Sequence, residues 1–250
     1  MPELTILYYT SNHLDTKNPL FLRNTKKQLA KAIGNLPLIV VSHKPVDQFT
    51  EGEYKNVVVD LPRHHLSIYK QILIGAKEAK TDYVALAEDD ILYSFEHFHS
   101  PEIEKNLKPD LFVYDMCKVS LFTWTQPPMF SFRTKRKVIN QLVAPRKYLI
   151  EALEERFRRV EELKSMGWTE EKILHYFGDL GRYEKQLGVT IRNTYEAYCN
   201  NPSIVFSHPE AYGYLSQGSK KKLGDLKIIE LYGWGRASEV LKLWGDYPLK

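Results

Sequence analysis

Apolar and polar positions follow two different patterns along the first third of the chain. Short uninterrupted apolar runs, which are typical of strands buried on both faces of a parallel sheet, occur at 4–9, 38–41, 57–59 and 83–87. Between these runs, apolar residues recur at helical spacing and predict helices over 18–34 and 67–80. Because strands alternate with helices, right-handed crossovers would build a mostly parallel sheet, and we expect an α/β fold.

The pattern is less regular beyond residue 110. Further strands are predicted over 111–114, 118–123, 137–143 and 203–206. A long charged helix is predicted to open at 145–147 and to reach Lys164, a second helix follows from Thr169, and a terminal helix covers 237–244. The pattern therefore predicts one α/β domain that is followed by a helical extension.

The composition is that of a folded protein. Of the 250 residues, 43% are apolar and 12% are aromatic, which excludes a largely disordered chain. The formal net charge of +4 is ordinary for an enzyme and does not by itself indicate nucleic-acid binding. Two cysteines, Cys117 and Cys199, are too few for a disulfide framework, and no apolar run approaches the roughly 20 residues that span a bilayer. We therefore expect a cytoplasmic protein.

Three consecutive acids, Glu88-Asp89-Asp90, directly follow the apolar run at 83–87. Ligands of open α/β sheets bind beyond the carboxyl ends of the strands, where Thr10-Ser11-Asn12 and Ser42-His43 also fall. Adjacent like charges repel, so we prefer a functional interpretation in which the carboxylates hold a hard divalent cation and leave positions for phosphate. A solvated turn is the alternative.

The segment from Gly75 to Asp90 resembles the helix, strand and DxD element of GT-A fold glycosyltransferases, in particular the group with a family-2-like nucleotide-binding half. The resemblance implies a GT-A-like (Rossmann-like), mostly parallel sheet flanked by helices. It also implies a nucleotide-sugar donor, with a UDP-sugar expected, and Mn²⁺ or Mg²⁺ as cofactor. In this family the last acid of the triplet binds the metal, which makes Asp90 the expected ligand and places Glu88 and Asp89 against the donor.

The same resemblance implies further donor contacts. The family's first strand leads into a loop that holds the base and ribose, so Thr10 and Asn12 are the corresponding candidates. A basic residue is common in the helix before the triplet, and Lys70 is the rough match in this chain. A solvated lysine on an amphipathic helix is the alternative for Lys70.

Downstream, the sequence at 177–180 and the sequence at 188–191 resemble the family's acidic motif and its glycine before a strand. In inverting members the acid removes the proton from the acceptor hydroxyl, and Asp179 occupies the matching position. The alternative is that Asp179 caps a helix over 180–187. One residue can fill both roles.

Two later features add candidates. His208 follows the predicted strand at 203–206, and some GT-A enzymes supply a histidine from such a strand to the metal; imidazole is a reasonable ligand for Mn²⁺. A structural histidine is the alternative. The loop at 216–222 combines a glycine with three lysines, so Lys220 could close over the diphosphate, or the loop could be solvated surface.

The densest basic run of the chain lies at 133–137. On a strand, Arg133, Lys135 and Lys137 would point the same way and could follow phosphates, which favours an anionic acceptor such as DNA with a hydroxylated base. A solvated cationic face, with a saccharide as acceptor, is the alternative.

We therefore expect a metal-dependent glycosyltransferase that moves a sugar from a nucleotide-sugar to an acceptor hydroxyl. The GT-A-like domain would cover 1–224, with a nucleotide-sugar-binding half over 1–95 and an acceptor half over 96–224, and a helical extension would cover 225–250. A nucleotidyltransferase can share the sheet and the acidic metal site, but it normally needs a glycine-rich basic loop after its first strand. A noncatalytic nucleic-acid or carbohydrate binding protein is the remaining alternative.

Overall fold

The computed structural model describes residues 3–132, 136–208, 211 and 224–245. Its centre is a seven-stranded sheet in the order β10-β6-β9-β4-β1-β2-β3. The strands are β1 (Leu4–Thr10), β2 (Leu38–Ser42), β3 (Tyr54–Val58), β4 (Tyr83–Glu88), β6 (Leu111–Asp115), β9 (Leu142–Pro145) and β10 (Asn193–Ala197). Neighbouring strands run parallel except where β9 pairs with β4 and β6. The expected α/β class, a mostly parallel sheet flanked by helices, is confirmed.

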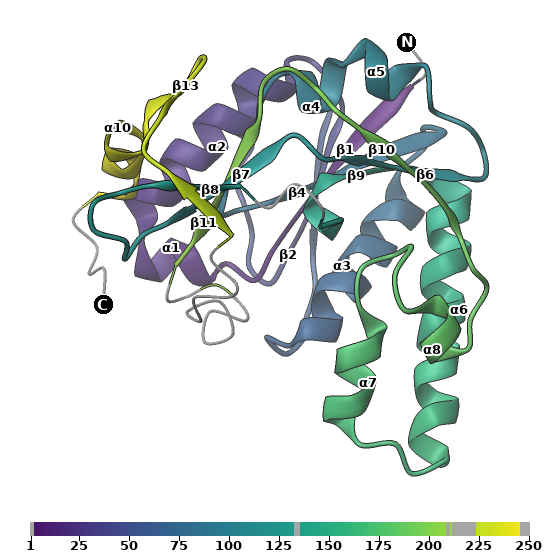
Figure 1. The fold of residues 1–250 in the computed structure, drawn as a ribbon. Coiled ribbons are helices and arrows are strands. Elements are labelled where there is room, and N and C mark those ends of the chain that lie inside the picture. The colour runs from purple at the N-terminus through teal and green to yellow at the C-terminus, as the bar shows by residue number, and fades with distance from the viewer. Residues whose placement is uncertain (1–2, 133–135, 209–210, 212–223, 246–250) are drawn as a thin grey trace.

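Helices cover both faces of this sheet (Figure 1). The bounds are α1 (His13–Lys17), α2 (Pro19–Ile33), α3 (His65–Glu78), α4 (Glu96–His99), α5 (Pro101–Glu104), α6 (Arg146–Ser165), α7 (Glu170–Phe177) and α8 (Glu184–Leu187). Side chains of β1 alternate between the faces: Ile6 and Tyr8 share a core with α2, α4 and α5, whereas Leu7 and Tyr9 share one with α3, α6 and α7. No helix of the described ranges is both long and apolar enough to cross a membrane.

A second, five-stranded sheet has the order β12-β8-β7-β11-β5. Its strands are β5 (Ile91–Leu92), β7 (Lys118–Phe122), β8 (Phe130–Phe132), β11 (Ser203–Ser207) and β12 (Asp225–Lys227). Strand β5 begins immediately after the acid triplet and pairs antiparallel with β11, so the end of β11 lies beside the triplet. A main-chain hydrogen bond of 3.0 Å from Phe206 N to Asp90 O fixes this approach.

The carboxy-terminal part of the described chain packs against α2. A two-stranded ribbon of β13 (Glu230–Leu231) and β14 (Gly235–Arg236) leads into α10 (Ala237–Leu241) and the 3₁₀ turn η3 (Lys242–Trp244), in place of the continuous helix expected over 237–244. Trp244 is fully buried, with its ring centre 4.6 Å from that of Phe21 and 4.8 Å from that of His208. Asn18 Nδ2 also donates to Trp244 O at 2.8 Å, which joins this segment to the start of α2.

One predicted strand is wrong. The chain over 137–143 is irregular up to the 3₁₀ turn η1 (Ile139–Gln141), and β9 begins only at Leu142. The main-chain N–H of Ile139 donates to a carboxylate, Asp179 Oδ1, at 2.9 Å instead of to a neighbouring strand. Lys137 therefore lies on no strand, so the prediction that it shares a strand face with Arg133 and Lys135 is wrong for Lys137.

We predict that Gly75→Val destabilises the protein by about 1–3 kcal/mol, because α3 approaches the sheet closely at this position. A Cβ there would lie 3.2 Å from Val41 Cγ2 and 3.4 Å from Leu7 Cδ2. Urea denaturation measures the loss. Lys70→Val, at an exposed position of the same helix, is the matched control and should cost well under half as much. Equal losses would mean that helix propensity, and not packing, sets the cost.

Candidate functional site

A cavity of about 1200 Å³ opens at the carboxyl ends of β1 and β4. Its walls come from both sheets and from α3 and α7. Six of the residues that the sequence singles out line it: Thr10, Glu88, Asp89, Asp90, Asp179 and His208. The fold therefore brings together residues that are far apart in sequence, at the sheet edge where an α/β fold binds its ligands.

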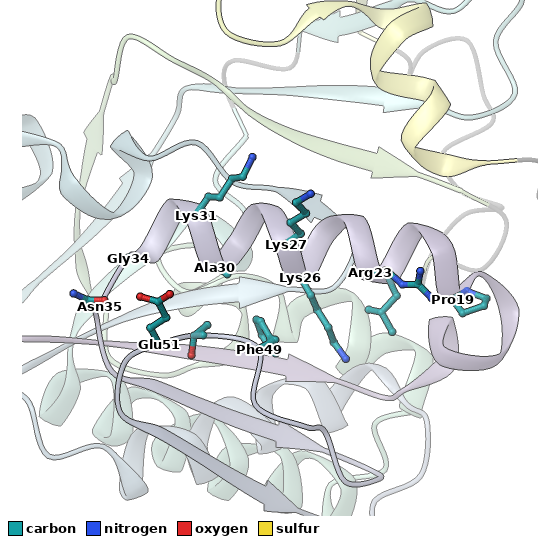
Figure 2. A pocket seen from close by; sticks show the side chains of 12 residues that line it. Pro19, Arg23, Lys26, Lys27, Ala30, Lys31, Gly34, Asn35, Phe49 and Glu51 are labelled. Carbon is teal, nitrogen blue, oxygen red and sulfur yellow. The ribbon is translucent and has the colours of Figure 1, made fainter.

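A second cavity, of about 780 Å³, lies between α2 and the loop at 49–51 (Figure 2). Cationic side chains of α2 line it, and Lys26 Nζ lies 5.7 Å from the ring centre of Phe49. Glu51 is the one acid among its lining residues, and none of the predicted site residues that the structure describes lines it. Because it lacks a carboxylate pair for metal or acid–base chemistry, we place the candidate site in the first cavity.

The acid triplet is held by neighbours from two other segments. Tyr9 Oη donates to Glu88 Oε1 at 2.7 Å, and Asn140 Nδ2 donates to Glu88 Oε2 at 2.6 Å. Thr10 Oγ1 donates to Asp89 Oδ2 at 2.5 Å. Glu88 and Asp89 thus have fixed orientations, whereas Asp90 Oδ1 is buried and finds no hydrogen-bond partner among the described residues. The unused acceptor is the atom that a cation would satisfy.

Burial raises the pKa of all three carboxyl groups. The pKa of Glu88 rises to about 8, and the charge of Asp90 adds to the effect of desolvation while the bonds from Asn140 and Tyr9 oppose it. Desolvation raises the pKa of Asp90 to about 7. Desolvation and the charge of Asp90 together raise the pKa of Asp89 to about 6. Like charges this close are costly without a compensating cation, which is the electrostatic setting of a divalent-metal site.

His208 lies beside the triplet. Its Nε2 is 3.6 Å from Asp90 Oδ2, and its side chain is buried against the ring of Trp244. Within the described ranges, no group of three or more His, Cys, Asp and Glu side chains is arranged to hold a metal ion. Of the residues that the structure describes, Asp90 and His208 therefore offer two ligands, which leaves coordination positions for a substrate or water.

Asn12 does not line the cavity, but it holds the loop that carries Thr10. Its φ of 55° is left-handed, a conformation that asparagine tolerates, and its Oδ1 accepts hydrogen bonds from the main-chain N–H groups of His43 and Lys44, both at 2.9 Å. Its own N–H donates to Thr10 Oγ1 at 2.9 Å. Thr10 lines the cavity and Asn12 does not, so Asn12 ties the loop after β1 to the end of β2.

Two further predicted residues, Lys70 and Lys137, do not line the cavity. Lys70 is exposed on α3 and is not among the lining residues. Lys137 donates to Thr194 Oγ1 at 2.7 Å and pairs with Glu196 at 3.4 Å, both on the edge strand β10. Three predicted residues lie outside the described ranges: Arg133, Lys135 and Lys220.

Asp179 faces the cavity from the turn between α7 and α8. Its Oδ2 pairs with Arg182 at 2.9 Å, and its Oδ1 accepts from Ile139 N at 2.9 Å. The helix expected over 180–187 is wrong in its start, because α8 begins at Glu184 and Tyr183 precedes it. Asp179 therefore caps no helix. Its carboxylate joins the turn to η1 and leaves the acid at the cavity wall.

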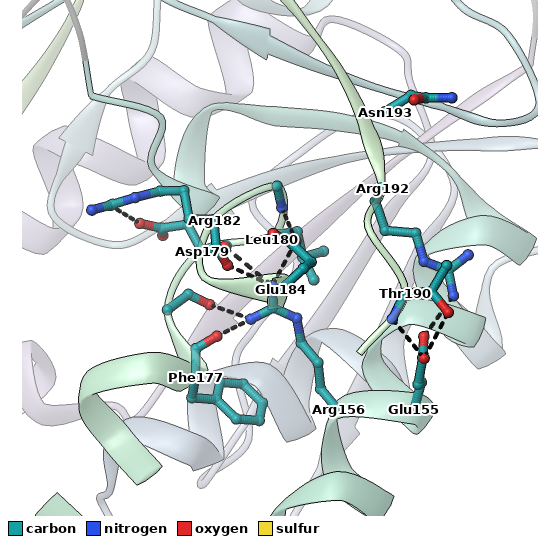
Figure 3. A network of polar contacts seen from close by, with 12 residues as sticks. Glu155, Arg156, Phe177, Asp179, Leu180, Arg182, Glu184, Thr190, Arg192 and Asn193 are labelled. Atoms are coloured by element: carbon teal, nitrogen blue, oxygen red, sulfur yellow. Dashed lines mark hydrogen bonds and ion pairs between the residues drawn. The ribbon is translucent and has the colours of Figure 1, made fainter. Parts of the chain in front are cut away.

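A buried guanidinium organises this turn (Figure 3). Arg156 of α6 is 1% exposed, and its Nη2 donates to Glu184 Oε1 at 2.8 Å. The same guanidinium donates to four main-chain carbonyls, those of Phe177, Gly178, Asp179 and Arg182. Gly181 has a φ of 80°, and a Cβ there would clash with Thr194 Cγ2, so the turn needs glycine as well as Arg156.

Sequence reasoning missed residues that complete the site. Asn140, which holds Glu88, arrives from 52 positions away in the sequence, and no local pattern marks it. Gln71 Nε2 donates to the carbonyls of Thr10 and Val41 at 2.9 and 3.0 Å, and so anchors α3 under the loop after β1. A polar residue on the otherwise apolar face of the 67–80 helix is the one signal that could have found Gln71.

We predict that Arg156→Met costs about 3–5 kcal/mol of folding stability, because it leaves Glu184 and several carbonyls of the turn buried without a donor. Urea denaturation measures the loss. The control is Arg159→Met on the same helix: Arg159 is half-buried, pairs with the exposed Glu162 and donates one hydrogen bond to Leu187 O, so its removal should cost about 1–2 kcal/mol, well below the loss at Arg156. A loss at Arg156 as small as that at Arg159 would show that the turn does not depend on the guanidinium.

No protein-family model matches the sequence, and no curated protein matches it. Solved structures with similar folds include a nucleotidyl transferase from Methanothermobacter thermautotroptrophicus, with 12% identity and a TM-score of 0.42 over 80% of this chain and 88% of that one. They also include the glycosyltransferase GlyE of Streptococcus pneumoniae, with 7% identity and a TM-score of 0.45 over 78% and 46%. The bifunctional IspDF of Campylobacter jejuni has 14% identity and a TM-score of 0.40 over 79% and 50%. The chain thus spans about half the length of the last two, and the likeness concerns the fold alone.

Proposed function

We propose that this protein is a glycosyltransferase that uses a nucleotide-sugar donor, with a UDP-sugar expected. The observation that supports the proposal best is one cavity that holds the triplet Glu88-Asp89-Asp90 at the end of β4 and a separate acid, Asp179, on the opposing turn. A metal–diphosphate site and a general base need two such groups of carboxylates in one cavity. A module that only binds a ligand needs neither.

Asp90 and His208 would hold the divalent cation, Mn²⁺ or Mg²⁺. The residues fit this role, because Asp90 Oδ1 is buried with an unused acceptor and His208 Nε2 lies 3.6 Å from the other carboxylate oxygen. A cation bound there would offset the negative charge that develops on the departing diphosphate. Two protein ligands leave room for phosphate oxygens, as Mg²⁺ and Mn²⁺ sites in nucleotide enzymes require.

The other residues of the cavity act on the two substrates. Thr10 and Asp89, which are hydrogen-bonded to one another, and Glu88 present polar atoms to the donor. Asp179 accepts the proton of the acceptor hydroxyl, while the oxygen of that hydroxyl forms a bond to the anomeric carbon of the sugar. The bond from that carbon to the diphosphate breaks, and the nucleoside diphosphate leaves with the electron pair. The configuration at the anomeric carbon is inverted in this reaction.

We predict that the protein is stabilised by a nucleotide-sugar together with Mn²⁺, and that Asp90→Asn removes this metal-dependent part while the fold stays intact. Asparagine nearly conserves the shape of Asp90, and it removes a charge whose burial already raises the pKa of that carboxyl to about 7. Thermal unfolding against a panel of nucleotide-sugars and nucleoside triphosphates, with and without Mn²⁺, measures the effect, and calorimetry gives the affinities.

The same panel tests the rival reaction. If the protein binds a nucleoside triphosphate and converts it with release of diphosphate, its activity is nucleotidyl transfer, and the proposal of a glycosyltransferase is wrong. Unchanged metal-dependent affinity in Asp90→Asn would remove Asp90 from the metal site.

We predict that Asp179→Asn lowers the rate of sugar transfer by about 10²–10⁴-fold with little change in donor affinity, because the lost interaction is that of a base in the transition state. Arg182→Gln breaks the same ion pair but keeps the carboxylate, so a much smaller loss is expected from it. Single-turnover rates at saturating donor give the comparison. Similar losses in the two variants would assign Asp179 a structural role in the ion pair.

A further inference from the structure

A lysine that the proposed reaction does not use lies in the wall of the same cavity. Lys118 opens β7, exposes 7% of its surface and lines the cavity together with Ser120, two positions along the same strand. Its Nζ is buried and has no hydrogen-bond partner among the described residues. A buried ammonium group without a partner is costly, so it is retained where an anion can pair with it.

The nearby carboxylates are already engaged. Asp115 Oδ2 lies 3.0 Å from His97 Nδ1, and its Oδ1 accepts from Cys117 N at 2.9 Å. Asp179 is paired with Arg182. Both carboxylates stabilise the charge of Lys118 at a distance, but neither one bonds to its Nζ.

The cavity is therefore electrostatically divided. The triplet makes the wall at the end of β4 acidic, whereas Lys118 and the exposed Arg136 add positive charge to the wall formed by β7 and the segment after β8. Desolvation, together with repulsion from Arg136, lowers the pKa of Lys118 to about 8, although Asp115 and Asp179 oppose the shift. The group is thus mostly protonated at pH 7 and close to losing its proton, and a bound anion would secure the charge.

We propose that Lys118 binds an anionic group, a carboxylate or a phosphate, of the acceptor substrate, and that it thereby selects acceptors that carry a negative charge close to the reacting hydroxyl. The assignment to the acceptor rests on the proposed function, which gives the acidic wall to the donor and its cation. Asp179, whose charge acts on Lys118, is the proposed base, so both residues would contact the same substrate. The selecting charge is thus that of Lys118, which lies outside the basic run at 133–137.

The test uses the whole chain with ¹³C,¹⁵N-labelled lysine, and it follows the Nζ resonance of Lys118 by NMR. Inorganic phosphate and acetate are the probes, each added with and without saturating UDP and Mg²⁺, which is diamagnetic and does not broaden the resonance. We expect one of them to raise the pKa of Lys118 from about 8 and to shift its resonance in a saturable way. Preference for phosphate indicates a phosphorylated acceptor, and preference for acetate indicates an acidic sugar or another carboxylate.

Variants separate binding from folding. Lys118→Met keeps the length of the side chain without its charge and should weaken binding of the preferred probe by about tenfold or more, whereas Lys118→Arg should retain most of it. Lys108→Met, at an exposed position before β6, is the control and should change nothing. The wild-type resonance still reports on the proposal if a variant fails to fold.

A Lys118 resonance that neither probe moves, or equal binding by Lys118→Met and the wild type, would overturn the proposal. The outcome is distinct from failure of the proposed function, because binding of UDP with Mg²⁺ is measured separately and should be the same in all three variants. If the wild type does not bind UDP, the proposed donor site is wrong. Anion binding at Lys118 would still be established or rejected by the NMR result alone.

Discussion

The candidate site depends on one buried charge, the guanidinium of Arg156. A turn that carries Asp179 into the cavity has to leave several carbonyls without partners from regular structure, and a buried carbonyl without a donor is unfavourable. Arg156 supplies those donors from the side of a long helix, and Glu184 balances its charge. Arginine suits this role because its planar group carries five donors and stays charged when buried. The acid at the cavity wall is thus held by the core of the α6 side of the sheet.

The opposite wall is held in a different way. The triplet follows β4 in the centre of the sheet, where parallel pairing with β1 places Tyr9 beside Glu88. Hydrogen bonds from Tyr9, Thr10 and Asn140 then orient two of the three acids, while the third keeps an unused oxygen. The site therefore combines a rigid acidic wall, which comes from the sheet itself, with a catalytic candidate on a turn. Binding and orienting the donor are the proposed functions of the first, and proton transfer is the proposed function of the second.

The sequence predicted β1, β2, β4, α2 and α3 well, because short apolar runs and a clear helical period mark them, but it located only the end of β3 and did not predict α1. It also predicted that the triplet and Thr10 lie together beyond the carboxyl ends of β4 and β1, as they do. The edge strand β10 escaped prediction, because its half-exposed residues form no apolar run. Asn140 and Lys118 escaped as well, since their importance comes from contacts between distant segments. Lys137 was misplaced because a carboxylate, Asp179, captures the N–H of Ile139 and interrupts the predicted strand.

The packing of Trp244 on His208 gives the protein an order of assembly. His208 borders the acid triplet, yet one of its faces is supplied by a ring that is made only after the whole ribbon and α10 have been synthesised. During translation, the acid triplet is synthesised early, whereas the imidazole beside it is fully packed only when η3 docks on α2. A chain that lacks residues 237–244 would therefore keep the triplet but leave one face of the imidazole uncovered.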